Sequence, residues 1–435
     1  MTRPHANPND LRTTPFRDSQ TGFTGWVADL PEQRGLCTPA VEGARLFMGG
    51  GFGSYAFYAL DAHTGALLWH RDTSDDGPTA AVYCDGRVVF NTESCTVFAL
   101  DARSGEIAWE RWLGDPLLAQ PAAANGRVFM AYPARGTHRL AALDLMNGRH
   151  LWEATITADV ITAPVVSGDA VYISTWDGQV WVFDARSGDL RSCENLNATS
   201  APWIWKGEIF VAKREAGARG SAGVHESVWR RRRGGWTRSS GRMRAAYLES
   251  KRLTPSGNLH ALMDASVGFG SAPAAAKLNL SEQRVGAHTV SGAWRHQGSR
   301  PCVWGERLYT TTGDRLSATD AETGAELWSW MGDGGSGEDR VLSPPAVVNG
   351  RVYAGSHDGR LYSWDAETGR VRWEVRVGRP VSWQPAVCGG WIYAGLEGGR
   401  VLGLETGDPL DDGWAMWGGG AGHNGAVGAS IHEAQ

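Results

Sequence analysis

The stretch Asp61-Ala-His-Thr-Gly65-Ala-Leu-Leu-Trp69 recurs along the chain and decides its fold. Six copies keep the same step from Asp to Gly, and five of them also keep the step from Gly to Trp. A repeat of roughly 40 residues is typical of folds built from stacked units. The repeated residues are Asp61, Gly65, Trp69, Asp101, Gly105, Trp109, Asp144, Gly148, Trp152, Asp184, Gly188, Asp320, Gly324, Trp328, Asp365, Gly369 and Trp373, and Ser192 replaces the Trp of the fourth copy.

A second phrase lies upstream of the first and counts the units. It runs from Pro through small apolar residues to an Asn-Gly or similar turn, as in Pro121-Ala-Ala-Ala-Asn-Gly126. Each unit then contains four short strands joined by Gly turns, without the helical periodicity that crossover helices would need. Eight such units predict a β-propeller. The units begin at Pro39, Ala80, Pro121, Pro164, Pro202, Pro301, Pro345 and Pro385.

The last unit lacks a Trp strand, and the N-terminal segment contains one that no unit uses. The last unit ends in Gly403-Leu-Glu-Thr-Gly407 without a Trp, and Gly25-Trp26 precedes the first unit. The sequence therefore predicts an all-β chain with a single eight-bladed β-propeller of four-stranded antiparallel blades, closed by the N-terminal strand. We expect an extension over residues 1–21, the propeller over 22–410 and a Trp/Gly-rich tail over 411–435.

The repeat resembles the tryptophan-docking repeat of pyrroloquinoline-quinone-type propellers. That superfamily includes quinoprotein dehydrogenases and the non-enzymatic outer-membrane assembly lipoprotein BamB. The resemblance implies that each Trp lies flat between adjacent blades, while the Gly and Asp shape the turn. The repeated residues would then build the ring, and function would lie in whatever does not repeat.

The main feature that does not repeat is basic. Residues 213–252 hold 12 Lys and Arg against three Glu, whereas the whole chain has a net charge of -5. An acidic protein partner, anionic lipid or nucleic acid could bind this stretch, or it could be a solvated insertion that balances an acidic body; nucleic acid is the least favoured partner. Alternation in a hairpin would place Arg230 and Arg232 on one face. The candidate partner-binding residues are Trp229, Arg230, Arg231, Arg232, Arg233, Trp236, Arg242 and Arg244.

Two other segments do not follow the repeat: the rest of the fifth-blade insertion and the C-terminal tail. We expect 213–292 to be a basic insertion within the fifth blade, with a short helix over 242–251 and Trp294 as that blade's delayed fourth-strand Trp. In the tail, Trp414 and Trp417 are expected to plug or dock the ring.

An enzymatic alternative follows from the resemblance alone. In quinoprotein relatives, pyrroloquinoline quinone lies on the ring axis with calcium, and many carry a disulfide between adjacent cysteines. The six cysteines here include no adjacent pair, and the sequence has no CxxCH, GxSxG, P-loop or HExxH motif. We therefore expect no catalytic residue, metal ligand or cofactor, and favour a scaffold that binds a protein partner over a quinoprotein-like dehydrogenase.

The N-terminal residues lack the apolar core of a signal peptide, and no apolar run is long enough to span a membrane. This pattern predicts a cytoplasmic protein. The resembled proteins are mostly exported, so a periplasmic location remains the alternative. The sequence does not determine the oligomeric state.

Overall fold

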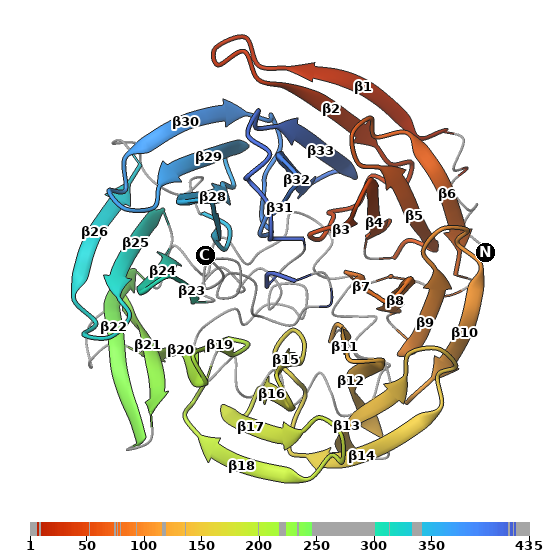
Figure 1. Ribbon diagram of the computed structural model, residues 1–435, viewed down its shortest axis with the longest axis vertical. Helices are drawn as coiled ribbons and strands as arrows, with labels where there is room; N and C mark the ends of the chain where they lie inside the picture. The colour runs from red at the N-terminus through yellow and green to blue at the C-terminus, as the bar shows by residue number, and fades with distance from the viewer. Residues whose placement is uncertain are drawn as a thin grey trace, which may run out of the picture.

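The computed structural model is a ring of eight antiparallel sheets around a central axis (Figure 1). It describes residues 7, 10–245, 301–332 and 342–422, apart from 52, 74, 76, 79, 93, 115–118, 135, 199, 217–222, 233–234, 313, 416–417 and 421. No α-helix occurs among these described residues. The predicted all-β, eight-bladed propeller is confirmed.

Each blade is a meander whose strands follow one another from the axis to the rim. The first four blades are β3 (Ala40–Glu42), β4 (Arg45–Gly49), β5 (Ala56–Asp61) and β6 (Leu67–Asp72); β7 (Val82–Cys84), β8 (Arg87–Asn91), β9 (Thr96–Asp101) and β10 (Ile107–Trp112); β11 (Ala122–Ala124), β12 (Arg127–Ala134), β13 (Thr137–Asp144) and β14 (His150–Ile156); and β15 (Val165–Ser167), β16 (Ala170–Ser174), β17 (Gln179–Asp184) and β18 (Leu190–Asn195).

The second half of the ring repeats this order. It contains β19 (Trp203–Trp205), β20 (Glu208–Ala216), β21 (Gly223–Arg232) and β22 (Gly235–Ala245); β23 (Cys302–Trp304), β24 (Arg307–Thr312), β25 (Arg315–Asp320) and β26 (Glu326–Met331); β27 (Ala346–Val348), β28 (Arg351–Gly355), β29 (Arg360–Asp365) and β30 (Val371–Arg376); and β31 (Ala386–Cys388), β32 (Trp391–Leu396) and β33 (Arg400–Glu405).

The innermost strand of each blade has only three residues and is followed by a tight turn. Asn125 and Gly126, with φ of 53° and 70°, form this turn in the third blade. Asn349 and Gly350 form it in the seventh blade, with φ of 48° and 66°. Asn and Gly tolerate this left-handed conformation best, which explains why they recur at the position.

The ring closes between the two halves of the eighth blade, as predicted. Strand β2 (Thr24–Asp29) pairs antiparallel with β33, with Trp26 opposite Gly403. A further strand, β1 (Arg12–Arg17), pairs with the outer side of β2, so the closing blade has five strands. Part of the segment expected as an extension over residues 1–21 therefore belongs to the sheet.

The fifth blade differs from the expectation in its fourth strand. That strand is β22, which follows β21 after a short turn, so the prediction that Trp294 supplies it was wrong. The helix predicted over 242–251 is also wrong for residues 242–245, which lie in β22. Most of the basic stretch is thus sheet. Trp294 itself lies outside the described residues.

Apolar side chains fill the space between blades. Phe57 of β5 and Phe90 of β8 stack across the first interface, with ring centroids 4.1 Å apart. Both are completely buried, as are Tyr58 of β5, Tyr309 of β24 and Tyr353 of β28. The core is therefore a circle of inter-blade layers, and the inner and outer edges remain for contacts with other segments.

Candidate functional site

Repeated tryptophans join neighbouring blades at several junctions of the ring. In the sixth blade, Trp328 donates its indole N–H to the carbonyl of Ala366, 3.0 Å away in the seventh blade. Its ring covers Gly369, where a Cβ would lie 2.4 Å from the indole Cε3. The same indole bond is made by Trp26, Trp69, Trp109 and Trp152 to the carbonyls of Ala62, Ala102, Leu145 and Ala185.

The repeated aspartates fold the turn that receives the indole. Asp320 Oδ1 accepts the backbone N–H groups of Glu322 and Thr323, at 3.0 and 2.6 Å. The Thr323 backbone bond and its hydroxyl together lower the pKa of Asp320. Asp365 makes the same contacts, and bonds from Arg372 and Thr368 outweigh the effect of burial, so that its pKa falls to about 2. These residues serve the ring's own geometry.

Among the described residues, two junctions lack a repeated Trp, and both involve the fifth blade. The fourth-strand Trp is replaced by Ser192 in the fourth blade, and β22 carries no docked Trp into the sixth. At the junction between the fifth and sixth blades, Arg230 of β21 replaces the indole. Its Nη1 donates to the carbonyl of Ala321. Ala321 follows Asp320 as Ala366 follows Asp365, so the guanidinium bonds the same carbonyl that an indole bonds elsewhere.

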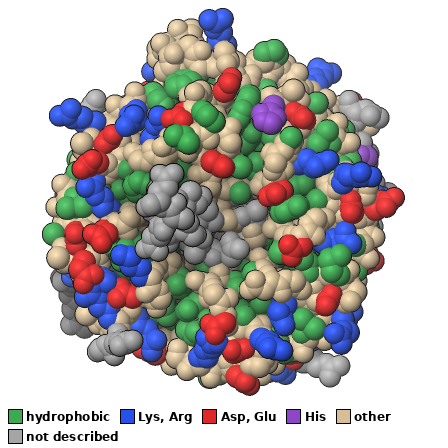
Figure 2. Space-filling model, viewed as in Figure 1, with side chains coloured by type: hydrophobic (Ala, Val, Ile, Leu, Met, Phe, Trp, Pro, Cys, Tyr) green, Lys and Arg blue, Asp and Glu red, His purple; other side chains and the backbone are tan. Residues whose placement is uncertain are grey.

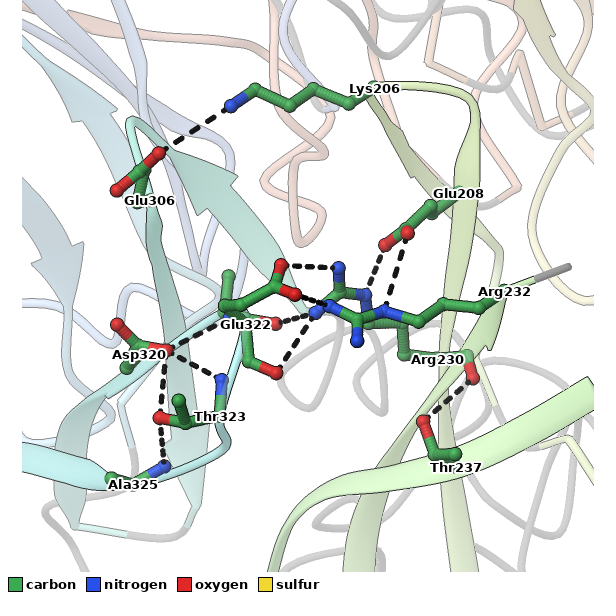
Figure 3. A network of polar contacts seen from close by, with 11 residues as sticks. Lys206, Glu208, Arg230, Arg232, Thr237, Glu306, Asp320, Glu322, Thr323 and Ala325 are labelled. Carbon is green, nitrogen blue, oxygen red and sulfur yellow. Dashed lines mark hydrogen bonds and ion pairs between the residues drawn. The ribbon is translucent and has the colours of Figure 1, made fainter. Parts of the chain in front are cut away.

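Arg230 is a buried charge with carboxylate partners on two blades. Its side chain is 4% exposed and pairs with Glu208 of its own blade and Glu322 of the sixth. Burial alone would lower the pKa of Arg230, but these two carboxylates outweigh it and raise the pKa, so the group stays charged. Arg232 reaches the same two glutamates (Figure 3). The expected alternation in the hairpin is therefore observed.

The opposite face of the β21–β22 hairpin contacts the fourth blade. Arg231 Nη2 lies 2.5 Å from Glu194 Oε1 of β18, and Trp236 donates its indole N–H to Glu194 Oε2 at 2.6 Å. Polar contacts thus replace the missing Trp at this junction as well. Glu194, Glu208 and Glu322 were not predicted as site residues from the sequence. The arginine run itself could have indicated them, because arginines buried in a sheet need carboxylates on the neighbouring strands.

The remaining predicted partner-binding residues lie elsewhere on the blade. Trp229 is half-buried, with its indole N–H on Ser227 and the Lys213 ammonium 5.1 Å from its ring centroid. Arg242 and Arg244 lie in β22, opposite Glu226 and Val224. Arg233 lies outside the described residues.

The part of β22 that carries Arg242 and Arg244 belongs to a blade whose strands are longer than those of the first blade. In the first blade, pairing of the second and third strands ends at Gly49 opposite Phe57. The equivalent strands of the fifth blade continue for four further pairs, from Lys213 opposite Ser227 to Ala216 opposite Val224. At about 3.4 Å per residue, this extension makes the strand pair roughly 14 Å longer than that of the first blade. The third blade continues for three further pairs, from Tyr132 opposite Arg139 to Ala134 opposite Thr137.

The tail enters the centre of the ring. Trp414 exchanges two backbone hydrogen bonds with Val387 of β31, and its ring stacks on Trp203 of the fifth blade with centroids 5.5 Å apart. Only 1% of Trp414 is exposed. The carbonyls of Ala415 and Gly422 accept from Val41 in the first blade and Ala123 in the third. Trp417 lies outside the described residues.

An ionic anchor fixes the start of the tail. Asp411 is fully buried and bonds Arg351 Nη1 at 2.5 Å and Asn349 Nδ2 at 2.9 Å. Asp408 bonds the same two side chains at 2.8 and 3.0 Å. The tail is therefore fixed to the seventh blade before it crosses the axis.

The described part of the chain contains no group of three or more His, Cys, Asp or Glu side chains arranged to hold a metal ion. Cys37, Cys84, Cys193 and Cys388 are free thiols, and burial raises the pKa of Cys37 and Cys388 to about 12. Across the described residues, we find no helix with the length and apolar character of a membrane span. On the face shown in Figure 2, acidic and basic side chains intermingle around the rim.

Comparisons with known proteins match the ring as a whole. The BamB structure from Moraxella catarrhalis superposes with a TM-score of 0.58 at 14% identity, covering 91% of this chain and 98% of that one. BamB from Bordetella pertussis is 26% identical over 243 residues, which is 54% of this chain and 47% of that protein. The dehydrogenase subunit of the quinone alcohol dehydrogenase from Gluconobacter oxydans is 34% identical over 105 residues, 22% of this chain and 14% of that protein.

The matched segments thus span less than half the length of these two curated relatives. A family profile described as outer membrane protein assembly factor BamB matches residues 17–114, 93–262 and 312–417. These segments make up well over half of the chain and include strands from all eight blades. The chain therefore belongs to the family of outer membrane protein assembly factor BamB.

Proposed function

We propose that this protein is a non-catalytic scaffold that binds a protein partner, with the part of the fifth blade that carries Arg242 and Arg244 as the contact. The observation that carries the proposal is the division of the basic stretch into two parts. Arg230, Arg231 and Arg232 form ion pairs within the ring. Arg242 and Arg244 lie in the last pairs of β21 with β22, away from the residues that form these ion pairs.

The extension presents two kinds of contact. Register places Arg242 and Arg244 two residues apart, so both lie on the same face of β22. Among the described strands, β22 is the last of its sheet, and an edge strand carries backbone groups that a partner strand can pair with. An acidic segment of a partner protein combines both features. Anionic lipid and nucleic acid are the other outcomes of the test.

Point variants test this contact better than a deletion, because removing residues 213–292 would remove β21 and β22. The double variant Arg242→Glu/Arg244→Glu should lose the partner that the wild-type chain recovers in cross-linking and pull-down experiments. The matched control, Arg103→Glu/Arg186→Glu, changes two exposed arginines on turns of other blades and should retain it. Equal recovery by both double variants would contradict the proposed contact.

The second candidate function is a quinoprotein-like dehydrogenase, favoured by the similarity to the quinone alcohol dehydrogenase subunit. The resemblance places its cofactor on the ring axis, where the tail bonds Val387, Val41 and Ala123 in this chain. These contacts fit a cofactor poorly and support the scaffold. Titration with pyrroloquinoline quinone and calcium tests the alternative, and saturable cofactor absorbance with alcohol-dependent dye reduction would establish it.

The family description also bears on the compartment. We propose that the protein acts in the periplasm, in place of the cytoplasmic location that the sequence favoured, because the family is described by outer membrane assembly. Fractionation of cells expressing the tagged chain from its natural gene would test this. Recovery only with cytoplasmic markers would overturn the periplasmic location.

A further inference from the structure

The junction between the fourth and fifth blades lacks both halves of the contact that a docked Trp makes elsewhere. Ser192 stands at the position of the Trp in the fourth blade. In the fifth blade, the connection from β21 to β22 is Arg233-Gly234, so the Asp-to-Gly turn that receives an indole in other blades is missing from the sequence. Other contacts must therefore hold these two blades together.

The apolar layer of this junction is made of small side chains. Its members surround no completely buried aromatic ring, and the rings beside it, Tyr172, Trp229 and Trp236, are only partly buried. By contrast, Phe57 and Phe90 are completely buried where the first blade meets the second. Since aromatic rings bury the largest apolar areas, separation costs less at the fourth-to-fifth junction. The buried members of the layer are Val165, Ala170, Val180, Val182, Ala198, Ile204, Ile209 and Val211.

The carboxylate of Glu194 in β18 connects the fourth blade to two side chains of the fifth. Its Oε1 lies 2.5 Å from Arg231 Nη2, and its Oε2 accepts the indole N–H of Trp236 at 2.6 Å. The side chains of Glu194 and Arg231 are 34% and 38% exposed. Dissolved salt therefore screens this ion pair effectively.

The other side of the fifth blade is held by buried groups. Arg230 is 4% exposed and bonds Ala321 and Glu322 of the sixth blade, and salt screens such a buried charge much less. Trp203 of the fifth blade and Tyr309 of the sixth also belong to one buried apolar cluster. Salt thus weakens the two sides of the fifth blade unequally.

We infer that the propeller has a salt-sensitive seam between its fourth and fifth blades, which Glu194 holds closed. When this contact is broken or screened, the ring opens locally along the layer between β17 and β20, and the fifth blade stays with the sixth. Such local opening needs less free energy than global unfolding. The inference concerns the ring itself and goes beyond the proposed partner contact.

Thiol labelling of the folded, full-length protein measures this opening. Val211 is fully buried in the seam, so Val211→Cys places a thiol where a labelling reagent reaches it only when the two blades separate. Cys95 in the second blade and Cys302 in the sixth are buried native cysteines and serve as internal controls. Peptide mapping by mass spectrometry gives the labelling rate at each position.

The thiol introduced by Val211→Cys should react faster than Cys95 and Cys302. Adding Glu194→Gln, or raising NaCl to about 1 M, should speed its labelling by about two- to fivefold, the range expected for an exposed ion pair, and should leave Cys95 and Cys302 unchanged. The matched control Glu153→Gln removes a similarly exposed carboxylate that pairs with Arg139 inside the third blade. It should not change the rate at position 211.

Three outcomes would overturn the inference. They are equal labelling at all three positions, no response to Glu194→Gln, and equal acceleration at all three, which would indicate global unfolding. Val182→Cys on the facing strand β17 provides the same measurement if Val211→Cys does not fold. Labelling does not involve a partner, so this inference and the proposed contact at Arg242 and Arg244 can fail separately.

Discussion

Replacing Arg230 with Ala tests whether an arginine holds the junction between the fifth and sixth blades. The substitution removes a charged hydrogen bond to the Ala321 carbonyl and leaves Glu208, which is 23% exposed, without its closest partner. Glu322 is 62% exposed and contributes little, because solvent screens its charge. Breaking a buried ion pair costs about 3–5 kcal/mol, so with this discount the free energy of unfolding should fall by about 3 kcal/mol.

Urea unfolding followed by tryptophan fluorescence measures this loss, and Arg231 provides the matched control. Its ion pair with Glu194 is more than one third exposed on both sides, so Arg231→Ala should cost only about 0–1 kcal/mol. In 1 M NaCl the cost of Arg231→Ala should vanish, while most of the cost of Arg230→Ala should persist, because buried charges are screened less. A loss below about 0.5 kcal/mol for Arg230→Ala would refute the argument.

Three further predictions concern other parts of the ring. Trp328→Ala should lower the free energy of unfolding by about 3 kcal/mol in urea unfolding, because it empties a large aromatic site; a loss typical of surface positions would contradict docking. Gly369→Ala should cost more than Gly350→Ala in the same assay: both have positive φ, but only the Cβ at 369 meets the Trp328 ring. His138 lies 3.1 Å from the buried Asp159, and although burial lowers its pKa, the carboxylate outweighs this and raises it. The pair therefore stabilises the protein fully below about pH 6.5 and loses its effect as the pH rises through the raised pKa, so wild-type stability should fall between pH 6 and 8 more steeply than that of His138→Gln; parallel pH profiles would refute this.

The repeat predicted the ring because its signal is local. Asp365, Gly369 and Trp373 lie within nine residues, and the same Asp and Gly occur in six units and the same Trp in five. The pairing of Trp26 with the last unit also followed, because the missing Trp of that unit matched an unused one near the N-terminus.

The fifth blade could not be predicted in the same way. The contact between Arg230 and Ala321 joins residues 91 positions apart and depends on the strand register, which no repeat specifies there. The basic composition suggested a separate insertion, although most of residues 213–252 continue the sheet. Trp294 was predicted as the fourth-strand Trp by analogy with the other blades. In the structure, Arg230 bonds the carbonyl that an indole bonds in those blades.

The path of the tail was not visible in the sequence. Gln384 meets Gly418 only because the tail turns back into the ring, and that path depends on long-range contacts such as Arg351 with Asp411.

The pairing of β2 with β33 also has a consequence for biosynthesis. During translation, Trp26 emerges from the ribosome early, yet the strand beside it is completed only when Glu405 has been added. At about 5–20 residues per second, β2 waits roughly 20–75 seconds with an unpaired edge. A nascent chain that is shielded during this interval, by a chaperone or by its own early blades, would reach the closed ring more efficiently than one that is not.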